Sequence, residues 1–564
     1  MKRIISMLLC AILILSLAVG CGSKDTTAQN DKKEENQSQS AQSEKKEENV
    51  EKTEEKTEGE DIPPYLNKEG FPIVKEPITL KFMVKRTAVQ PPHEEIYVWQ
   101  EYEKMTGVKI EWINVPDTDL AEKRNLAIAS GDLPDVFIRC GFPDLDVLRY
   151  GEQGVFIELN DLIDKYAPNL KACMEQYPEV GKGLPEYNGK IYAAPVLYDS
   201  EAILTGTRFF IRRTWIDKLG LSMPTTTDEL YEVLKAFKEN DPNGNGKADE
   251  IPWTTTNISV IVNALKGAWG LQNRGSKHPN VDWDEEANDL RFIPITDEYK
   301  ELLQYVRKLY SEGLIDQEIF TMDHAKLIAK GEQDLVGAFN FANSQAIGAS
   351  HEQEYEGIPE ALEGPHGHKL WVQKGPVLSS KGSFQITNVC KYPEVAMRWI
   401  DYFYSEEGAT FFYMGVEGVT YTKKPDGTLE YSIKELENMP EGTSFDQIVG
   451  KYTPYMGGGN PQLTKTHYFK GGETQPIPLK AAQNVAPYAP KEIWGGFNHT
   501  IEEAERLAEL QNDIITYVDS MRAQFITGEA SFDQWDDYVK QIQQMNLDEY
   551  MEIYKKGYER YSNN

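Results

Sequence analysis

The chain has 564 residues, of which 90 are Asp or Glu and 59 are Lys or Arg, so its formal net charge is −31. This charge argues against proteins that wrap nucleic acid or lie on anionic membranes, because both of those partners are also negatively charged. The length is sufficient for about two to four domains, or for two large lobes. The 30 Tyr and 10 Trp residues provide many side chains that combine an apolar face with a polar edge.

The N-terminus has the pattern of a signal peptide over residues 1–20. Two basic residues precede an apolar run at 4–19, which is too short to span a bilayer comfortably. The sequence Ala18-Val19-Gly20-Cys21 resembles the lipobox of bacterial lipoproteins, with a departure at Ala18, where Leu is usual. The resemblance implies cleavage before Cys21 and lipidation of that residue. The alternatives are an ordinary secretory peptide that is cut nearby, or an uncleaved anchor.

Residues 21–65 are predicted to be a disordered acidic tether. Positions 22–61 are rich in charged residues, Gln, Ser and Thr, and they contain no aromatic residue, Leu or Ile, so they cannot bury enough apolar surface to fold. Lipid and tether together would hold the folded body outside the cytoplasmic membrane by acyl chains. No later run approaches 18 apolar residues, so we expect no membrane-spanning segment after residue 20.

The cysteines of the body indicate neither a disulfide framework nor a zinc site. Cys10 lies in the signal peptide and Cys21 is the expected lipid site, which leaves Cys140, Cys173 and Cys390. These three are widely spaced, odd in number and include no CxxC pair. We expect buried structural thiols.

From residue 76 the chain alternates short β-rich runs with helical patterns, which predicts an α/β fold with a mostly parallel sheet. Predicted strands are 78–83, 108–112 and 135–138, and predicted helices are 94–106 and 154–166. Ligands of such sheets bind beyond the carboxyl ends of the strands. Arg139 directly follows the third predicted strand and is therefore a candidate ligand-binding residue.

Several motifs follow one another between about residues 76 and 562. They are Ala129-Ser130-Gly131-Asp132-Leu133-Pro134-Asp135-Val136, Tyr187-Asn188-Gly189-Lys190-Ile191-Tyr192-Ala193-Ala194-Pro195, Trp215 to Leu221, Ala329-Lys330-Gly331-Glu332, Tyr392-Pro393-Glu394-Val395-Ala396, Phe525-Ile526-Thr527-Gly528 and Met545-Asn546-Leu547-Asp548-Glu549-Tyr550. In their order and spacing these motifs resemble the extracellular solute-binding proteins of ABC importers, in the family that includes maltose-binding proteins. The C-terminal motifs are similar to the larger lipoprotein branch, which includes binders of alginate oligosaccharides.

The resemblance implies a type II periplasmic-binding-protein-like fold, in which two α/β lobes enclose a ligand cleft and extra helices follow at the C-terminus. One lobe would hold residues 76–196 and 385–425, and the other 197–384 and 426–564. The hinges are expected near 194–195 and 385–386.

The same resemblance suggests cleft residues. Arg139 matches a position that is aromatic in the maltose-binding pattern, and Phe341 falls where that family has a stacking Trp. Asn343 follows Phe341, and Trp253, Asn257 and Trp269 are further candidates from the second lobe. Sugar rings stack on aromatic faces, and their hydroxyls need polar partners. Core packing is the alternative for each aromatic residue, and a surface ion pair is the alternative for Arg139.

Residues 241–250 have the spacing of a calcium loop. Side-chain oxygens stand at loop positions 1, 3, 5 and 9, and a Gly stands at position 6, as in an EF-hand. Position 12 is Pro252, so the usual bidentate Glu is absent and Glu250 is the expected replacement. The predicted structural Ca²⁺ ligands are Asp241, Asn243, Asn245, the Lys247 carbonyl, Asp249 and Glu250. A metal-free Asn/Gly turn is the alternative.

No catalytic motif stands out. GxSxG and Walker patterns are absent, the Gly457-Gly458-Gly459 run indicates a flexible loop, and 90 acidic residues make carboxylate pairs uninformative. We expect a monomeric binding protein, not an enzyme, that delivers an oligosaccharide to an ABC permease and binds no nucleic acid. The alternatives are an extracellular carbohydrate-active lipoprotein enzyme, a sugar co-receptor for a membrane sensor, and an acidic adhesion protein.

Overall fold

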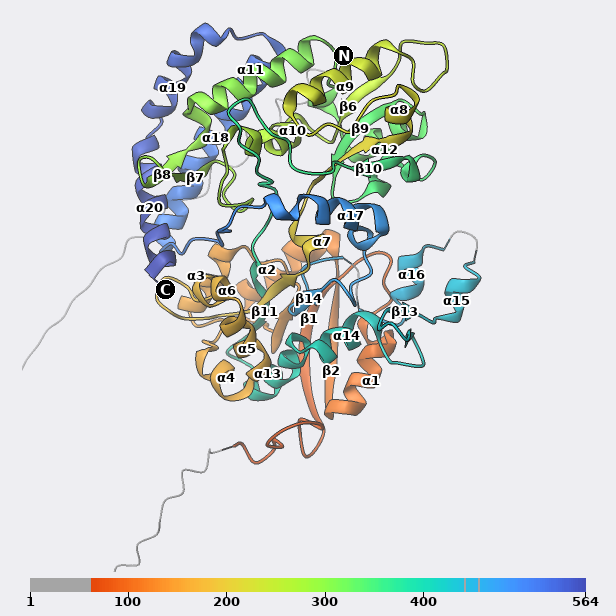
Figure 1. Ribbon diagram of the computed structural model, residues 1–564. Coiled ribbons are helices and arrows are strands. Elements are labelled where there is room, and N and C mark those ends of the chain that lie inside the picture. The colour runs from red at the N-terminus through yellow and green to blue at the C-terminus, as the bar shows by residue number, and fades with distance from the viewer. Residues whose placement is uncertain (1–61, 441–442, 455–456, 564) are drawn as a thin grey trace, which may run out of the picture. The chain divides into compact units, whose positions relative to one another are not determined.

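The structure is a computed structural model and describes residues 62–440, 443–454 and 457–563 (Figure 1). The predicted signal peptide, Cys21 and the tether up to residue 61 lie outside the described residues. The strands are β1 (Ile78–Arg86), β2 (Val108–Pro116), β3 (Val136–Ile138), β4 (Ala194–Asp199), β5 (Arg208–Arg212), β6 (Ile251–Thr254), β7 (Val281–Asp284), β8 (Asp289–Phe292), β9 (Val336–Phe341), β10 (Tyr355–Gly357), β11 (Leu378–Ile386), β12 (Tyr421–Lys423), β13 (Leu429–Tyr431) and β14 (Leu463–Lys465).

The helices cover both faces of the sheets and form the C-terminal part of the chain. They are α1 (Tyr97–Thr106), α2 (Leu120–Ser130), α3 (Asp144–Glu152), α4 (Asn160–Tyr166), α5 (Pro168–Gln176), α6 (Pro178–Gly183), α7 (Glu201–Leu204), α8 (Arg213–Lys218), α9 (Thr227–Glu239), α10 (Ile258–Leu265), α11 (Asp297–Ser311), α12 (His324–Glu332), α13 (Pro393–Asp401), α14 (Glu406–Met414), α15 (Lys434–Glu437), α16 (Phe445–Val449), α17 (Pro476–Val485), α18 (Ile501–Thr527), α19 (Trp535–Gln544) and α20 (Leu547–Asn563).

The first lobe is built on a six-stranded sheet with the order β14-β4-β11-β3-β1-β2. β1 pairs in parallel with β2 and β3, and β11 runs antiparallel to both β3 and β4. Its core includes Leu80, Phe82 and Val84, which alternate along β1 and lie on one face of the sheet. Because β1 to β3 run the same way, their carboxyl ends meet at one edge.

The second lobe is built on a four-stranded sheet with the order β10-β5-β9-β6. β6 and β9 are parallel, and β5 is antiparallel to β9 and β10. A separate hydrophobic core surrounds this sheet and includes Trp215, Phe237 and Leu303 from α8, α9 and α11. Each sheet therefore has a core of its own, as the predicted two-lobe α/β fold requires.

The strands predicted from short β-rich runs are confirmed as β1, β2 and β3. The helix predicted at 94–106 is α1, and Gly107 ends it with φ 73°, the left-handed conformation that favours glycine. The helix predicted at 154–166 is shorter: α4 begins only at Asn160. Residues 155–159 are not helical, and Phe156 forms an isolated antiparallel bridge with Thr387.

The first sheet takes in more of the chain than the predicted lobe boundaries assign to it. β4 runs to Asp199 and pairs with the part of β11 that begins at Leu378, so positions 196–197 and 384–385 lie inside strands of this sheet. β14 also pairs with β4, although its sequence falls in the range 426–564 assigned to the other lobe. A three-residue strand is too short to show a periodic pattern, so this return of the chain to the first sheet could not be predicted from residue periodicity.

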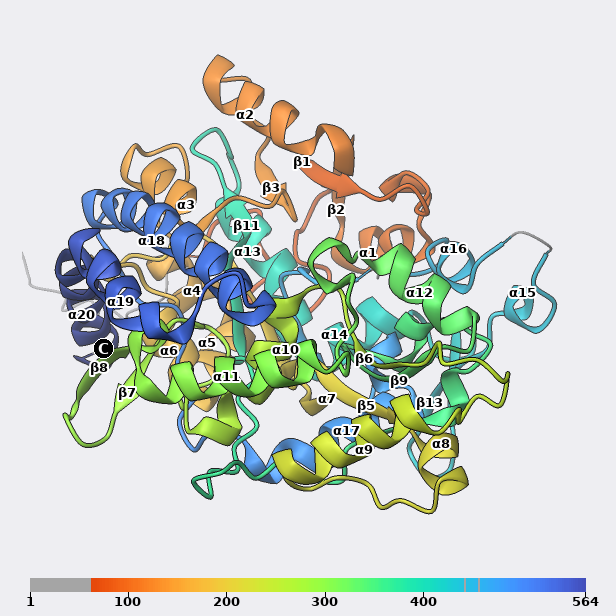
Figure 2. The same cartoon turned by 90° about the horizontal axis from the view of Figure 1, so that it is seen from above.

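The predicted extra helices at the C-terminus are α18, α19 and α20, drawn in blue in Figure 1 and seen from above in Figure 2. α18 contacts α3 of the first lobe and α11 of the second, and α20 contacts α6 and β8. The C-terminal helices thus touch elements of both lobes. Among the described residues, none of the helices combines the length and the apolar character needed to cross a membrane.

Candidate functional site

Arg139 lies at the carboxyl edge of the first sheet, directly after β3. Its backbone has φ 55°, which is uncommon for a residue with a side chain, and its N–H donates to the Ser383 carbonyl at 2.8 Å. The residue is 8% exposed. The structure therefore holds this side chain at the edge where ligands of parallel sheets bind.

Within the described part of the chain, the Arg139 guanidinium makes one hydrogen bond and no ion pair. Its Nη2 donates to the Gly458 carbonyl at 3.4 Å. Burial lowers the pKa of Arg139, and Tyr413 and Tyr198 act in the opposite direction. The surface ion pair considered from the sequence is therefore not what the structure shows. A guanidinium has five N–H donors, so most of these donors are left for another partner.

The loop that contacts Arg139 is the Gly457–Gly459 run, which the sequence suggested only as flexible. Gly459 N–H donates to the Tyr198 hydroxyl at 3.0 Å, and Ser383 Oγ donates to the Gly459 carbonyl at 2.5 Å. A Cβ on Gly458 would lie 2.4 Å from the Tyr198 hydroxyl, so only glycine fits this close approach. The loop therefore has a defined place over the edge of the sheet.

Gln462, at the start of β14, is a second polar group that the sequence did not single out. It is 0% exposed, and within the described residues neither its Oε1 nor its Nε2 makes a hydrogen bond of normal geometry, although the Tyr413 hydroxyl lies beside this amide. Its backbone carbonyl accepts from Leu197 N–H at 2.9 Å, which holds it beside β4. One buried amide in a short strand leaves no pattern that sequence reasoning could use.

Phe341 and Asn343 lie at the carboxyl end of β9 in the second lobe, and both are half-buried. The Phe341 ring stacks on the His324 ring of α12, with centroids 4.8 Å apart and planes at 7°. Asn343 lies against Gly472, whose Cβ position would be 3.1 Å from the Asn343 Nδ2 atom. Gly472 follows β14, so the chain that passes Arg139 also reaches Asn343.

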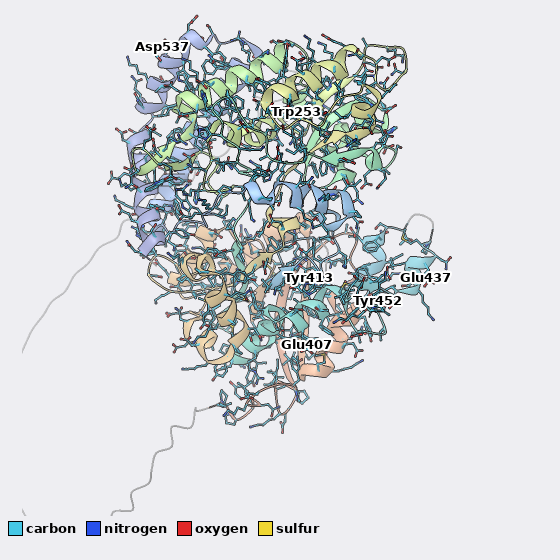
Figure 3. The ribbon with its side chains drawn as sticks, viewed as in Figure 1. Trp253, Glu407, Tyr413, Glu437, Tyr452 and Asp537 are labelled. Carbon is cyan, nitrogen blue, oxygen red and sulfur yellow. The ribbon has the colours of Figure 1, made fainter. Side chains whose placement is uncertain are left out.

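Core packing, the alternative considered from the sequence, describes Trp253 and Trp269. Trp253 is 0% exposed, stacks on Phe209 at 4.7 Å and donates through Nε1 to Asn340 Oδ1 at 2.7 Å; it is labelled in Figure 3. Trp269 is 2% exposed and packs against Tyr305. Rings this deeply buried have no free face for a sugar, so the structure does not support the prediction that Trp253 and Trp269 contact the ligand.

Asn257 is exposed and has a local role. It is the N-cap of α10, where its side-chain oxygen accepts from the Val260 N–H at 3.3 Å. Such a bond satisfies one of the unpaired N–H groups at a helix start.

The predicted calcium loop follows α9 and folds around the Asp241 carboxylate. Asp241 accepts from the N–H groups of Gly244, Asn245 and Gly246 at 3.0 to 3.1 Å. Asp249 Oδ1 accepts from the side-chain amides of Asn243 at 3.3 Å and Asn245 at 2.9 Å. Within the described residues, no three His, Cys, Asp or Glu side chains stand close enough to hold an ion.

The Glu250 carboxylate is the feature of this loop that best suits a bound cation. Both of its carboxylate oxygens are buried, and within the described residues neither accepts a hydrogen bond of normal geometry, although backbone groups of Glu250 and Asn243 lie near them. Burial raises the pKa of Glu250, and the charges of Asp241 and Asp249 raise it further. A cation would relieve both effects, because it would neutralise the carboxylate and supply it with a partner. The donor set of this loop therefore fits Ca²⁺.

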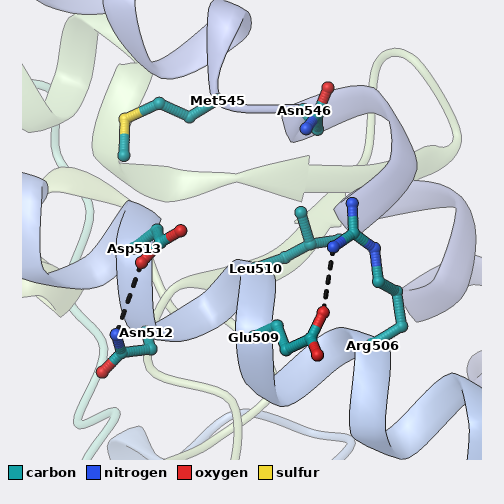
Figure 4. A pocket seen from close by; sticks show the side chains of 7 residues that line it. All are labelled: Arg506, Glu509, Leu510, Asn512, Asp513, Met545 and Asn546. Carbon is teal, nitrogen blue, oxygen red and sulfur yellow. Dashed lines mark hydrogen bonds and ion pairs between the residues drawn. The ribbon is translucent and has the colours of Figure 1, made fainter.

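Neither the described thiols nor the cavity beside α18 offers a competing site. Cys140 and Cys173 are buried, Cys390 is half-buried, all three are free, and burial raises the pKa of each to about 12. A surface cavity of about 440 Å³ lies between α18 and the start of α20 (Figure 4). Its one cation, Arg506, is already paired with Glu509 and Glu549.

The fold and this edge of polar groups define a two-lobe binding protein, and comparisons with known proteins agree. Residues 92–410 match the family of bacterial extracellular solute-binding proteins. The fructooligosaccharide ABC transporter substrate-binding protein FusA of Streptococcus pneumoniae is 32% identical over 88% of this chain and 92% of its own. The chain therefore belongs to the family of bacterial extracellular solute-binding proteins.

Further relatives and solved structures cover nearly the whole body. Lipoprotein LipO of Bacillus subtilis is 27% identical over 85% of this chain and 92% of its own. FusA in complex with kestose has a TM-score of 0.67 at 30% identity, covering 86% of this chain and 100% of that one, and an EF-hand mutant of FusA has been solved with fructo-nystose. Alginate-binding protein AlgQ2 without calcium ion has a TM-score of 0.64 at 25% identity, covering 86% and 99%.

Proposed function

We propose that the protein is the oligosaccharide-binding component of an ABC importer. It captures the sugar between its two lobes, does not alter it, and delivers it to the transmembrane permease subunits. A ligand that touches both lobes stabilises the closed arrangement only through its higher affinity for that arrangement, so closure reports occupancy to the permease. The relationship to FusA, which is described as an ABC transporter substrate-binding protein for fructooligosaccharides, supports this function.

The observation that carries the proposal is the set of spare donors on Arg139. A nine-tenths buried guanidinium with a single 3.4 Å hydrogen bond is costly unless a ligand completes it. Phe341 and Asn343 supply the opposite side of the site from the second lobe, with a ring face and an amide. Trp253 and Trp269 support the sheet from inside the core.

The anchor and the tether place this binding protein at the outer face of the cytoplasmic membrane. Cys21 carries the lipid, and its acyl chains hold the protein at the bilayer as a monomer. The acidic segment separates the lobes from the bilayer. The relative LipO, which is named a lipoprotein, supports this location. Globomycin treatment should cause the unprocessed precursor to accumulate, and Cys21→Ala should release the protein into the medium.

Ca²⁺ is proposed as a structural ion of the 241–250 loop. The side chains of Asp241, Asn243, Asn245, Asp249 and Glu250 and the carbonyl of Lys247 would hold it. The ion would pin the end of α9 to the start of β6 and take no part in ligand chemistry. The EF-hand mutant of FusA and the calcium-free form of AlgQ2 support such a loop in relatives. An unchanged melting temperature in both chelator and added Ca²⁺ would contradict this role.

The function is tested by a thermal-shift screen of the purified residues 62–564 against neutral and acidic oligosaccharides, with and without Ca²⁺. We expect a rise in melting temperature for one class of oligosaccharide, because a ligand that binds only the folded state stabilises it. Small-angle scattering of the same samples should show a smaller radius of gyration with ligand. Chromatography after long incubation should recover the ligand intact; cleaved products would indicate an enzyme.

A further inference from the structure

Two arginines at neighbouring strand ends lack a carboxylate partner. Arg86 is the last residue of β1, and Arg139 directly follows β3, which pairs in parallel with β1 in the register Val84 to Ile138. Both guanidinium groups lower the pKa of His93, which lies at the same edge and whose pKa burial brings to about 4. The two cations and a neutral imidazole therefore share one edge of the first sheet.

In this chain of net charge −31, the other described buried arginines have close partners: Arg124 and Arg208 donate to backbone carbonyls, and Arg212 pairs with Glu354. Arg149, Arg291 and Arg560 are examples of described arginines that are paired with Asp or Glu at 2.6 to 3.1 Å. The acid that acts on Arg139, Asp117, is itself paired with Lys85 at 3.1 Å. Among the described residues, Arg86 and Arg139 form no ion pair, and although the charge of Glu94 also acts on His93 at this edge, neither guanidinium has a carboxylate partner of its own.

On the basis of the proposed function, we propose that the oligosaccharide taken up by this protein carries carboxylate groups, as uronic acid units do, and that Arg139 and Arg86 bind them. The planar Arg139 fork matches a carboxylate in a bidentate pair, and its Nε and Nη1 have no partner among the described residues. Arg86 adds a second charge from the next strand. The ligand carboxylate thus supplies the negative partner that Arg139 and Arg86 lack within the described residues.

Polar groups around the pair fit the remaining oxygens of such a sugar. The Tyr198 hydroxyl accepts from Gly459 N–H at 3.0 Å and also interacts with the Ser379 side chain, so a polar hydroxyl is held at this place. The Gly458 carbonyl contacts Arg139 only at 3.4 Å, so a carboxylate at normal hydrogen-bond distance would displace a weak bond. A neutral hydroxyl could take the same place but would leave the two charges uncompensated in a site of low dielectric constant.

Isothermal titration calorimetry tests the ligand class with trimers of galacturonate and mannuronate, and with the uncharged trisaccharide kestose. We expect at least one uronate trimer to bind ~10-fold or more tightly than kestose, and its affinity to fall as NaCl is raised from 50 to 300 mM. Arg139→Met should weaken uronate binding at least ~30-fold, the loss typical when a charged partner is removed from a buried pair. Arg86→Met should have a smaller effect, on the order of 10-fold.

Controls separate a charge contact from a folding defect. Arg139→Lys keeps the charge but loses the fork, so it should retain part of the uronate affinity that Arg139→Met loses. Arg213→Met removes an exposed arginine that is paired with Asp217 in α8, and it should leave the affinity unchanged. Thermal melts of all variants check that they are folded.

The outcomes distinguish this inference from the function on which it rests. Tighter binding of kestose than of every uronate trimer, or an equal loss of both in Arg139→Met, would overturn the carboxylate assignment and leave the importer function standing. If no oligosaccharide of either class binds the folded protein, the proposed function itself fails. Preference for a uronate that is lost in Arg139→Met and partly kept in Arg139→Lys supports the assignment.

Discussion

Arg208 and Arg139 are both buried arginines at strand ends, one in each lobe, and they differ in what satisfies them. Arg208, at the start of β5, is 1% exposed and donates to the carbonyls of Gly206 at 2.8 Å and Pro478 at 2.9 Å. It also donates to the carbonyls of Ala202 and Ala342. Arg139 has only the 3.4 Å contact with Gly458. Arg208 thus ties α7, β5, the end of β9 and α17 together, whereas Arg139 keeps its donors free.

The buried side-chain amides of Asn340 and Gln462 differ in their hydrogen bonding in the same way. Asn340 accepts from the Trp253 indole and donates to the Arg208 carbonyl at 3.2 Å, whereas within the described residues Gln462 makes no hydrogen bond of normal geometry and has only the Tyr413 hydroxyl beside it. Buried polar groups are stabilising only when they are paired. Paired groups therefore mark what holds the fold, and unpaired groups at the sheet edge mark what a ligand completes.

The largest expected effect comes from exchanging the two arginines for methionine. Arg208→Met leaves four carbonyls without a donor, so we expect a loss of at least ~4 kcal/mol in the free energy of unfolding. Arg139→Met should cost less than ~1 kcal/mol, because it removes one long hydrogen bond. Urea unfolding monitored by Trp fluorescence measures both. Equal losses would mean that Arg139 also serves the fold.

Lowering the pH should destabilise the folded protein at a buried histidine that is favourable only in its neutral form. His278 is buried, its Nε2 lies 2.8 Å from the Gly495 carbonyl, and burial lowers its pKa from 6.5 to about 4. Between these values the unfolded chain binds the proton and the folded chain does not, so stability falls as pH drops from about 6.5 towards 4. The expected loss reaches ~3 kcal/mol.

His278→Gln keeps a donor for Gly495 but cannot be protonated, so it isolates this contribution. We expect its free energy of unfolding to fall less than that of the wild type between pH 7 and pH 4.5. His467→Gln, at an exposed histidine, should follow the wild type. A wild-type pH dependence in His278→Gln would contradict the assignment.

Replacing the two buried amides, Asn340 and Gln462, by Leu should change the free energy of unfolding in different directions. Asn340→Leu leaves the Trp253 indole N–H and the Arg208 carbonyl unpaired, and we expect it to cost ~2 kcal/mol. Gln462→Leu removes two unpaired polar atoms from a buried site, so it should leave the stability unchanged or raise it. The midpoints of urea unfolding curves with equal slopes give the sign of each change in stability. A cost of 2 kcal/mol in Gln462→Leu would show that the amide is paired in solution.

The smallest effect is expected in the calcium loop. In chelator, Glu250→Gln should raise the stability by roughly 0.5 kcal/mol, because it removes an unpaired carboxylate next to two others. In millimolar Ca²⁺ the same change should lower stability relative to the wild type, since a ligand oxygen is lost. Differential scanning calorimetry in both buffers measures this reversal, and Glu239→Gln, in α9 just before the loop, is the control. The same sign in both buffers would rule out Glu250 as a ligand.

The sequence identified the parts of this protein that depend on local chemistry. Alternating apolar residues gave β1 and β2, Gly107 gave the end of α1, and the spacing of Asp241, Asn243 and Asn245 gave a loop whose donors fit calcium. Arg139 was found because a residue after a parallel strand has a known place in the sheet. These features need only a few neighbouring residues.

The tertiary structure decided which polar and aromatic groups are satisfied. Trp253 and Trp269 looked like ligand contacts in the sequence, but Phe209, Asn340 and Tyr305 enclose them from elsewhere in the chain. Gln462 and the Gly458 loop gained their importance only because β14 returns to the first sheet beside β4. Burial and pairing arise from contacts between distant segments, so residue type and local spacing do not contain them.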